Sequence, residues 1–322
     1  MQRGALGGTA EATEVVAQVT PVFSEKGDEY GLCRALRLSA WVHWIQAQTE
    51  AAAGDWEQAA EHARRAGAEH ERVEILGWVA SSRFFGPTPV EDGIRRCESI
   101  RDEVGGHPAA VADVLQPLAG LHAMAGRFER ARELLTESEA IFEEHGLGLN
   151  SAVSHHAAMV ELLAGDAEAA ERSLRAGVEV LEEMGDRALV STTAAFLGQA
   201  LLAQGRTGEA EQFAALSEEL TAADDLITQV LWRGVRARTL AARDRREEAV
   251  RLAREAVALA ERSDFVNHRG DALMDLGIVL RQAGRAEEAR DALAEALGLF
   301  ELKGNAVAAG RAKAELAKPA RV

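Results

Sequence analysis

One short pattern recurs along the chain and constrains the fold more than any other feature of the sequence. In GRAEEARDAL (residues 284–293), a glycine is followed five residues later by an alanine. Related stretches begin at Gly54, Gly126, Gly165, Gly205 and Asp244, and a weaker copy near residue 90 has a glycine in place of the alanine. The small residues that this pattern marks are Ala59, Gly93, Ala131, Ala170, Ala210, Ala249 and Ala289.

A second pattern supports the repeat. Fifteen residues after three of these alanines, an apolar residue and one or two polar residues lead into a glycine, as in VLEEMG, which ends at Gly185. The phrase VFSEKG, which ends at Gly27, has the same form and points back to Ala12 as one more small position. The spacings between successive small residues are then 47, 34, 38, 39, 40, 39 and 40 residues.

A period near 34–40 residues is typical of a helical solenoid, in which each unit buries its apolar faces against its neighbours. We expect each unit to contain a helix A, a tight turn at the glycine, and a helix B. The composition agrees, because 47% of the residues are hydrophobic and only six are proline and one is tyrosine, and strand-like alternation is nearly absent. The sequence therefore predicts an all-α, right-handed solenoid of about seven helix-turn-helix repeats of 34–40 residues.

Two chemical interpretations of the repeated pattern fail on the sequence itself. A phosphate-binding loop needs a strand before its glycines and a Gly-Lys-Ser/Thr sequence after them, and neither is present around Gly284. Carboxylate pairs such as Glu287 and Glu288 recur in every unit rather than converging at one site. We interpret them as solvated helix faces with weak ion pairs to arginine.

The last unit resembles the tetratricopeptide repeat. Residues stand at that family's Leu-Gly, large apolar, turn and two small positions, namely Leu276-Gly277, Leu280, Gly284, Ala289 and Ala296. The pair Leu197-Gly198 repeats the first of these positions in the fifth unit. The resemblance covers essentially the whole chain, and it implies a superhelix whose concave face, formed by the A helices, binds a partner.

A narrower resemblance concerns residues 84–98 and 263–289. They are similar to the C-terminal repeat region of bacterial proteins that join a class III nucleotidyl cyclase, or another output domain, to an AAA/STAND-type ATPase. This resemblance implies that the chain is the sensor or scaffold portion of such a protein. It also implies that the cyclase residues and the nucleotide loop lie in parts absent from this chain.

We expect residues 1–322 to form a single domain. Residues 9–27 are predicted to be an orphan helix B, residues 28–304 the repeats, and residues 305–317 a C-terminal capping helix. The prolines of GPTP (86–89) predict a kink, because proline interrupts helical hydrogen bonding.

Charge and cysteine content exclude several classes of partner. A net charge of −16 and a pI near 5.1 argue against nucleic acid or an anionic membrane surface as a partner. The two isolated cysteines, Cys33 and Cys97, form no framework, and the first sixteen residues lack the apolar core of a signal peptide. We therefore expect a cytoplasmic protein.

The tetratricopeptide register also selects candidate binding residues. In that family, the second, fifth, ninth and twelfth residues of helix A face the concave groove. The ligand- or partner-binding candidates at these positions are Trp41, Trp44, Gln48, Trp78, Ser82, Phe85, Gln116, His155, Met159, Gln199, Arg238 and Arg281. The three tryptophans predict an aromatic patch at one end of the groove. The alternative, that they are core residues at the junction of the first two units, stays open.

No catalytic residue, metal ligand or cofactor is predicted. His155 and His156 are adjacent and point about 100° apart on a helix, and no HExxH or CxxC sequence accompanies the nine histidines. Nor is there a Ser/Cys–His constellation with a supporting motif. We therefore expect this chain not to be an enzyme.

The leading hypothesis is a non-catalytic module that binds a protein or peptide segment, or a small effector, in its groove. It would serve as the sensor or scaffold of a bacterial signalling ATPase or transcription regulator. One alternative is a stand-alone, self-associating scaffold or chaperone-like adaptor. Another is a small-ligand-binding protein or enzyme that uses an aromatic pocket at Trp41, Trp44 and Trp78.

Overall fold

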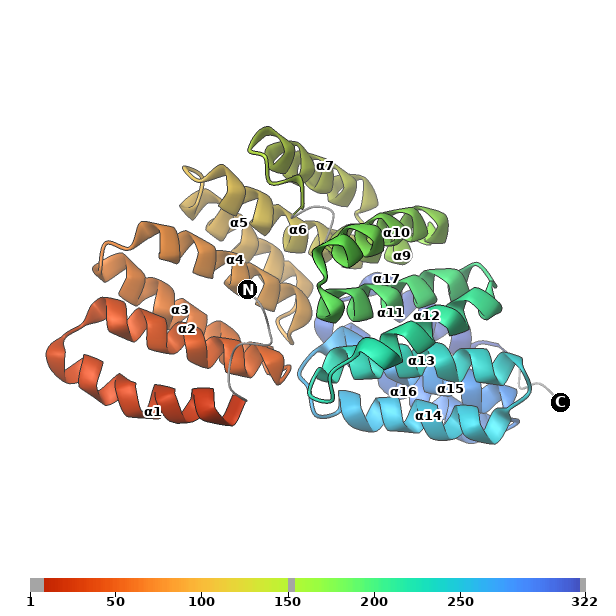
Figure 1. The fold of residues 1–322 in the computed structure, drawn as a ribbon. Helices are drawn as coiled ribbons and strands as arrows, with labels where there is room; N and C mark the ends of the chain where they lie inside the picture. The colour runs from red at the N-terminus through yellow and green to blue at the C-terminus, as the bar shows by residue number, and fades with distance from the viewer. Residues whose placement is uncertain (1–8, 150–153, 319–322) are drawn as a thin grey trace.

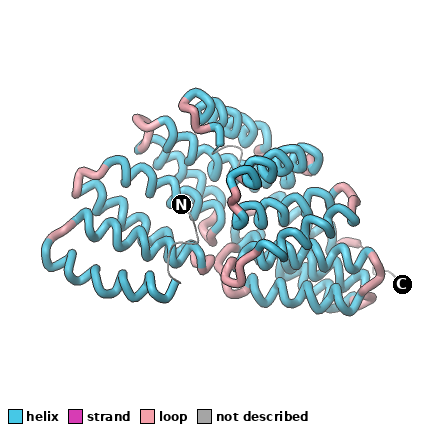
Figure 2. The backbone as a smooth tube through the Cα atoms, viewed as in Figure 1, coloured by secondary structure: helices cyan, strands magenta, loops and turns pink. Residues whose placement is uncertain are grey.

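The computed structural model describes residues 9–149 and 154–318, and within these ranges it contains helices and loops and no strand (Figure 2). The helices are α1 (Thr9–Lys26), α2 (Glu29–Ile45), α3 (Thr49–Arg65), α4 (Glu69–Phe85), α5 (Val90–Glu103), α6 (Pro108–Met124), α7 (Phe128–Glu144), α9 (His156–Ala164), α10 (Ala167–Met184), α11 (Arg187–Ala203), α12 (Thr207–Leu220), α13 (Leu226–Ala242), α14 (Arg246–Ala260), α15 (Val266–Gln282), α16 (Ala286–Lys303) and α17 (Ala306–Leu316). The all-α solenoid that the sequence predicts is confirmed.

Consecutive helices pair as antiparallel hairpins. From α2/α3 to α15/α16 they form seven A/B pairs, which we number units one to seven, with α1 before and α17 after them. In Figure 1 the hairpins climb the left side of the molecule from α1 to α7 and descend the right side from α9 to α14, with α15–α17 behind. Each A helix packs on its own B helix and on neighbouring A helices, so the apolar core runs continuously along the superhelix.

Helices end where the backbone turns into the left-handed region. Gly284 ends α15 with a φ of 80°, and Gly185 ends α10 with a φ of 70°. Glycine adopts this conformation without a steric cost, whereas a Cβ atom crowds the following carbonyl oxygen. Two positions with the same function lack glycine: Asp244 has a φ of 60° and Ala47 a φ of 56°.

The structure corrects the register that the sequence pattern gives for unit one. Gly54 lies inside α3 and ends no helix, and the left-handed residue at the end of α2 is Ala47. Counting five residues onward makes Ala52, rather than Ala59, the small residue of this unit. Gly67, fifteen residues after Ala52, ends α3 with a φ of 69°. The spacings become 40, 41, 38, 39, 40, 39 and 40 residues, so the repeat is regular throughout.

The small residues mark close crossings of helices A and B. A Cβ atom on Gly277 of α15 would lie 3.2 Å from the carbonyl oxygen of Ala289 and 2.6 Å from Cγ of Leu293, both on α16. In unit five a Cβ atom on Gly198 would lie 3.4 Å from the carbonyl oxygen of Ala210. The Leu-Gly pair and the small residue after the turn therefore allow two backbones to approach each other.

The superhelix closes on itself, because the loop between α14 and α15 docks on the turn between α2 and α3. The Asp264 carboxylate accepts hydrogen bonds from the backbone N–H of Thr49 at 2.7 Å, from the Thr49 hydroxyl at 2.5 Å, and from the backbone N–H of Glu50 at 2.8 Å. In return, the N–H of Asp264 donates to the carbonyl of Ala47 at 3.0 Å. We call this contact, together with the contacts of Lys303, Asn267 and Arg311, the seam.

Lys303, at the end of α16, makes the second seam contact. Its side chain is completely buried, and Nζ donates to the carbonyl oxygens of Arg83, Gly86 and Thr88 at 2.8, 2.7 and 2.7 Å. These carbonyls lie at and just beyond the C-terminal end of α4, where the helix dipole favours a cation. Unit seven thus supplies the cap that α4 cannot make for itself.

Further polar contacts extend the seam toward α6 and α9. Asn267 donates to Sδ of Met124 at 3.5 Å and accepts from Nδ2 of Asn305 at 3.0 Å. Arg311 of α17 donates to the carbonyls of Leu162 and Leu163 at 2.6 and 2.9 Å. The C-terminal helices therefore contact units one to four directly, in addition to unit six.

The helix-ending residues give a first prediction. Replacing Gly284 by alanine forces a Cβ atom into the left-handed region and should cost about 1 kcal/mol of stability. Replacing Asp244 by glycine relieves the same strain and should add about 0.5–1 kcal/mol. Urea denaturation of the two variants measures both, and shifts of the same sign would contradict the helix-end assignment.

The seam gives a second prediction. Lys303→Met leaves one buried and two partly buried carbonyls without this donor, which should cost about 2–3 kcal/mol and let the two ends of the superhelix separate. Small-angle scattering should then show a larger radius of gyration with unchanged helix content by circular dichroism. The control is Lys313→Met, which removes only an exposed ion pair to Glu301 and should change neither quantity.

Candidate functional site

In the tetratricopeptide register, the groove positions are the second, fifth, ninth and twelfth of the repeat, counted within the repeat and not from the first residue of each helix. The corrected register assigns them as follows. In unit seven these positions hold Asp271, Met274, Ile278 and Arg281. In unit one they hold Arg34, Arg37, Trp41 and Trp44. Gln48 is therefore not a groove residue: it occupies the turn as the N-cap of α3, and its Oε1 lies 2.9 Å from Nδ1 of His43. The sequence pattern predicts it in the groove because that pattern assigns the turn to Gly54.

Four tryptophans form one cluster between units one and two. The ring of Trp78 lies 4.5 Å from that of Trp41, 5.6 Å from that of Trp44, and 5.6 Å from that of Trp56, on which it stacks. Trp56 is completely buried, and the other three are half-buried. Each such ring pair contributes about 0.5–1.5 kcal/mol beyond its buried area. The cluster is thus a structural junction in which three of the four rings remain half-exposed.

The aromatic cluster continues into the seam. Trp44 contacts the ring of Phe265 at 5.7 Å, and Phe85 stacks on the same ring at 5.2 Å. His156 and His268 approach Phe85 at 5.9 Å each. Phe85 and Trp44 therefore touch side chains from unit seven, so this end of the groove is filled by the chain itself.

The two histidines beside Phe85 are neutral near pH 7. Burial lowers the pKa of His156 to about 3 and that of His268 to about 4, because a buried imidazolium loses its hydration. Nε2 of His156 and Nδ1 of His268 are buried without a hydrogen-bond partner. These rings serve here as apolar surface for the aromatic side chains.

The middle of the groove carries polar side chains. Oε1 of Gln116 accepts from the Ser154 hydroxyl at 2.6 Å, and Nε2 of His155 lies 2.8 Å from the Thr193 hydroxyl. Met159 packs between the two halves of the apolar core. Ser82 is buried and donates to the carbonyl of Trp78, which leaves it no exposed group for a ligand.

Gln199 differs from these residues. It lies half-buried on α11, at the ninth position of the repeat register of unit five. Its side-chain amide has no hydrogen-bond partner among the described residues. Neither the oxygen nor the nitrogen of this amide is one of the fully buried atoms that lack a partner. The amide is therefore available as a donor and an acceptor in the centre of the groove.

The two groove arginines are paired. Arg238 of α13 donates to Oδ1 of Asp275 at 2.8 Å, and Arg281 of α15 donates to the carbonyl of Glu315 at 3.0 Å and to its carboxylate. Each pair joins neighbouring helices of the superhelix. These arginines are thus not unneutralised cations that await an anionic ligand.

Two groove aspartates lack such partners. Asp113 of α6 and Asp271 of α15 both occupy the second position of helix A, and within the described ranges neither makes an ion pair or hydrogen bond. Burial raises the pKa of Asp113 to about 6, with a smaller effect from the charge of Glu74. Surrounding protein atoms and then the charge of Asp275 raise the pKa of Asp271 to about 7, although its side chain, like that of Asp291, is exposed to solvent. The unpaired charge of this face is negative.

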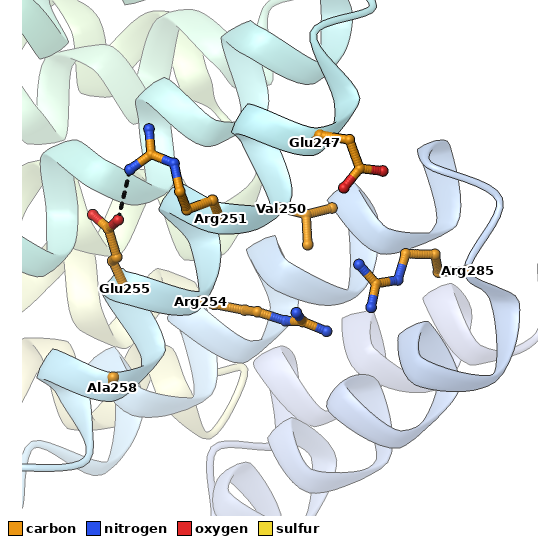
Figure 3. Close-up of a pocket in the computed structure, with 7 residues that line it drawn as sticks. All are labelled: Glu247, Val250, Arg251, Arg254, Glu255, Ala258 and Arg285. Atoms are coloured by element: carbon orange, nitrogen blue, oxygen red, sulfur yellow. Dashed lines mark hydrogen bonds and ion pairs between the residues drawn. The ribbon is translucent and has the colours of Figure 1, made fainter.

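The hollow drawn in Figure 3 lies elsewhere, on the B helices. Its volume is about 390 Å³, and it is lined by Glu247, Val250, Arg251, Arg254, Glu255, Ala258 and Arg285. Arg251 pairs with Glu255 at 2.8 Å, and Arg254 pairs with Glu288 at 2.6 Å. Because its charges already neutralise one another, this shallow surface offers little to a ligand.

The described residues contain no group of three histidine, cysteine, aspartate or glutamate side chains placed to hold a metal ion. Cys33 and Cys97 are both buried and free. In the same part of the chain, no helix has the length and apolarity needed to cross a membrane.

Sequence reasoning missed the residues of the seam. Asp264, Phe265 and Lys303 carry no motif, and their partners lie more than 170 residues away in the sequence. One available signal was the regular spacing, because only Ala52 gives unit one the period of the other units. That correction moves the turn to Ala47, where Asp264 docks.

The unpaired aspartate gives a third prediction. Because its folded-state pKa of about 7 exceeds the ordinary 3.8, Asp271 favours folding below pH 3.8, and this contribution is lost as the pH rises through 7. Asp271→Asn should therefore raise the melting temperature at pH 8, by about 1–2 °C after solvent screening, and by less at pH 5. Asp291→Asn, on the exposed face of α16, is the control with no expected change.

Comparison with known proteins bears on this geometry. The family model of the tetratricopeptide repeat matches residues 228–301, 40–65 and 192–215. These segments fall in units six and seven, unit one, and unit five. No curated protein matches the chain in sequence.

Among solved structures, a Rap protein complexed with Competence and Sporulation Factor has a TM-score of 0.69 at 15% identity, over 86% of this chain and 76% of that chain. NprR in complex with its cognate peptide NprX has a TM-score of 0.58 at 13% identity, over 86% and 89%. The APC/C hetero-tetramer Cut9-Hcn1 has a TM-score of 0.61 at 13% identity, over 82% of this chain and 46% of that chain. The present chain thus spans just under half of the last, and the likeness is one of fold.

Proposed function

Because the chain carries tetratricopeptide repeats, we propose that it is a non-catalytic module that binds a peptide or protein segment along its concave groove. The observation that carries the proposal is the unused hydrogen-bonding capacity on the A helices. Gln199 has a free amide, Gln116 uses only its oxygen, and the carboxylates of Asp113 and Asp271 are unpaired.

An extended peptide needs this kind of surface. Each of its residues brings a backbone N–H and a carbonyl that must be satisfied once water is removed. A glutamine amide supplies a donor and an acceptor at once, and a carboxylate accepts from N–H groups or from a basic side chain. Among the proteins of similar fold, the Rap structure holds Competence and Sporulation Factor and the NprR structure holds its peptide NprX.

Within the groove we assign three kinds of role. Gln116 and Gln199 bind the peptide backbone, Met159 contacts its apolar side chains, and His155 stays on the Thr193 hydroxyl beside them. Trp41, Trp44, Trp78 and Phe85 form the aromatic end. Arg238 and Arg281 position the neighbouring helices through their own hydrogen bonds, and Ser82 bonds to a carbonyl of its own helix. The acidic face favours a segment that carries lysine or arginine.

We also propose that residues 1–322 act as one domain in a larger signalling system. The resemblance of residues 84–98 and 263–289 to repeats beside AAA/STAND-type ATPases supports a sensor or scaffold role next to such an ATPase or a transcription-regulating output domain. The seam supports a single unit, because it joins unit seven to units one and two. The test is whether a groove-binding peptide changes ATP hydrolysis by an ATPase encoded with this chain.

The groove assignment gives a fourth prediction. Peptides are selected from a random phage-displayed library on the wild-type protein, and their affinities are measured by fluorescence anisotropy. Gln199→Arg places a long cation in the centre of the groove and removes the free amide, so affinity should fall at least tenfold, or about 1.4 kcal/mol.

The matched control makes the same substitution on the convex side of unit five. Gln212 lies exposed on α12, and Gln212→Arg adds the same charge there, so it should leave affinity within twofold of wild type. Equal losses in the two variants, or selected peptides that ignore both, would place binding outside the groove.

A further inference from the structure

The loop that closes the seam makes the contacts that a bound peptide would make. Residues 261–265 connect α14 to α15 and lie on the turn between α2 and α3. Asp264 presents a carboxylate to the start of α3, its N–H pairs with the carbonyl of Ala47, and Phe265 inserts an aromatic ring. A charged group, a backbone hydrogen bond and a side-chain anchor thus come from two adjacent residues.

The first contact satisfies a need of α3. Its N-cap, Gln48, makes no side-chain capping bond, so the helix lacks a local acceptor for its first N–H groups. The Asp264 carboxylate accepts from the N–H groups of Thr49 and Glu50 and from the Thr49 hydroxyl. A carboxylate at a helix N-terminus is favoured by both these bonds and the helix dipole. The residue that α3 needs comes from a position 215 residues away in the sequence.

The second contact fills an aromatic slot. Phe265 is 5% exposed and packs with Ala47 and Leu226 against Trp44 and Phe85. Trp44 and Phe85 both stand at the twelfth position of an A helix, which the repeat register directs toward the groove. The slot is therefore a groove position that the chain's own side chain occupies.

We propose that Asp264 and Phe265 are a built-in pseudo-ligand, and that the slot they fill accepts an acidic residue followed by an aromatic residue from a partner segment. The proposal rests on the proposed function, since it names one end of the same groove. The partner's carboxylate would replace that of Asp264 at Thr49 and Glu50, and its ring would replace that of Phe265.

Asp264 and Phe265 are covalently attached to the protein, and this attachment determines how tightly a partner segment must bind to displace them. A tethered segment competes at an effective concentration in the millimolar range. A free acidic–aromatic pair whose dissociation constant is no lower than this effective concentration cannot displace the loop by itself. A partner must therefore add contacts further along the groove, which restricts entry to segments that fit both places.

The experiment adds the loop sequence as a separate molecule. The double variant Asp264→Ala/Phe265→Ala empties the slot, and a fluorescein-labelled peptide RSDFVN, the sequence of residues 262–267, is titrated into it by anisotropy. The peptide should bind the double variant saturably and bind wild type at least tenfold more weakly. The peptide RSNAVN, which lacks the carboxylate and the ring, should bind neither protein.

Two further proteins separate the possible causes. Lys303→Met loosens the seam but keeps Asp264 and Phe265, so RSDFVN should bind it more weakly than it binds the double variant. If the double variant loses helix content, the single variant Phe265→Leu is used in its place. Its affinity for RSDFVN should be higher than that of wild type and lower than that expected for an empty slot. Equal binding to wild type and an emptied variant, or none to a folded emptied variant, overturns the proposal.

Failure here is distinguishable from failure of the proposed function. RSDFVN reports on the slot alone, so Gln199→Arg should leave its binding to the emptied protein unchanged. The affinity of the library peptides for Gln199→Arg, in contrast, reports on binding in the centre of the groove. A groove that binds library peptides while the emptied slot ignores RSDFVN refutes only the pseudo-ligand.

Discussion

Two charged side chains from the end of the chain complete two helices at its beginning, and the shape of the molecule depends on them. Asp264 caps the N-terminus of α3, and Lys303 caps the C-terminal carbonyls of α4. The Asp264 carboxylate and the protonated form of Lys303 both match the sign that the helix dipole favours, and burial lowers the pKa of Lys303 to about 7. A solenoid held only by contacts between neighbouring units has no preferred end-to-end distance, since each interface adds a small rotation. The seam selects one curvature and sets the width of the groove.

The local part of the fold could be predicted from the sequence because its causes are local. Gly284 and Gly185 end helices through their own backbone freedom, and the period of their recurrence requires paired helices. The error in unit one has the same origin: Ala47 adopts the left-handed conformation without being glycine, and Gly54 lies in a helix despite being one. A left-handed alanine at this place is held by surroundings from a distant part of the chain, including the Asp264 N–H on its carbonyl. No local pattern contains that information.

For the candidate site, too, the sequence predicts the features with local causes and not those that depend on distant parts of the chain. The register directs Trp44 and Phe85 toward the groove, because helical periodicity fixes which face a residue occupies. It cannot show that Phe265 covers them, since that contact depends on the summed rotation of every unit between. Arg238 and Arg281 illustrate the point further, because each meets a carboxylate on the next A helix or on α17. Gln199 keeps its amide free because no such neighbour reaches it. The sequence therefore predicts which face of its helix a residue lies on. Whether another side chain covers that residue depends on the fold of the whole superhelix.

The proposed binding and the seam are linked by this shared end of the groove. A ligand shifts a conformational equilibrium only by the difference between its affinities for the two states. A segment that binds around Gln199 alone contacts one half of the superhelix and has little preference between open and closed seams. A segment that also enters the slot at Trp44 and Phe85 must displace Phe265, and with it the cap that Asp264 gives to α3. Part of the binding energy gained in the centre of the groove then offsets the loss of the Asp264 and Phe265 contacts, while Lys303 of α16 still holds α4. Under the proposed function, the aromatic end is therefore where binding in the groove would change the contacts of the seam.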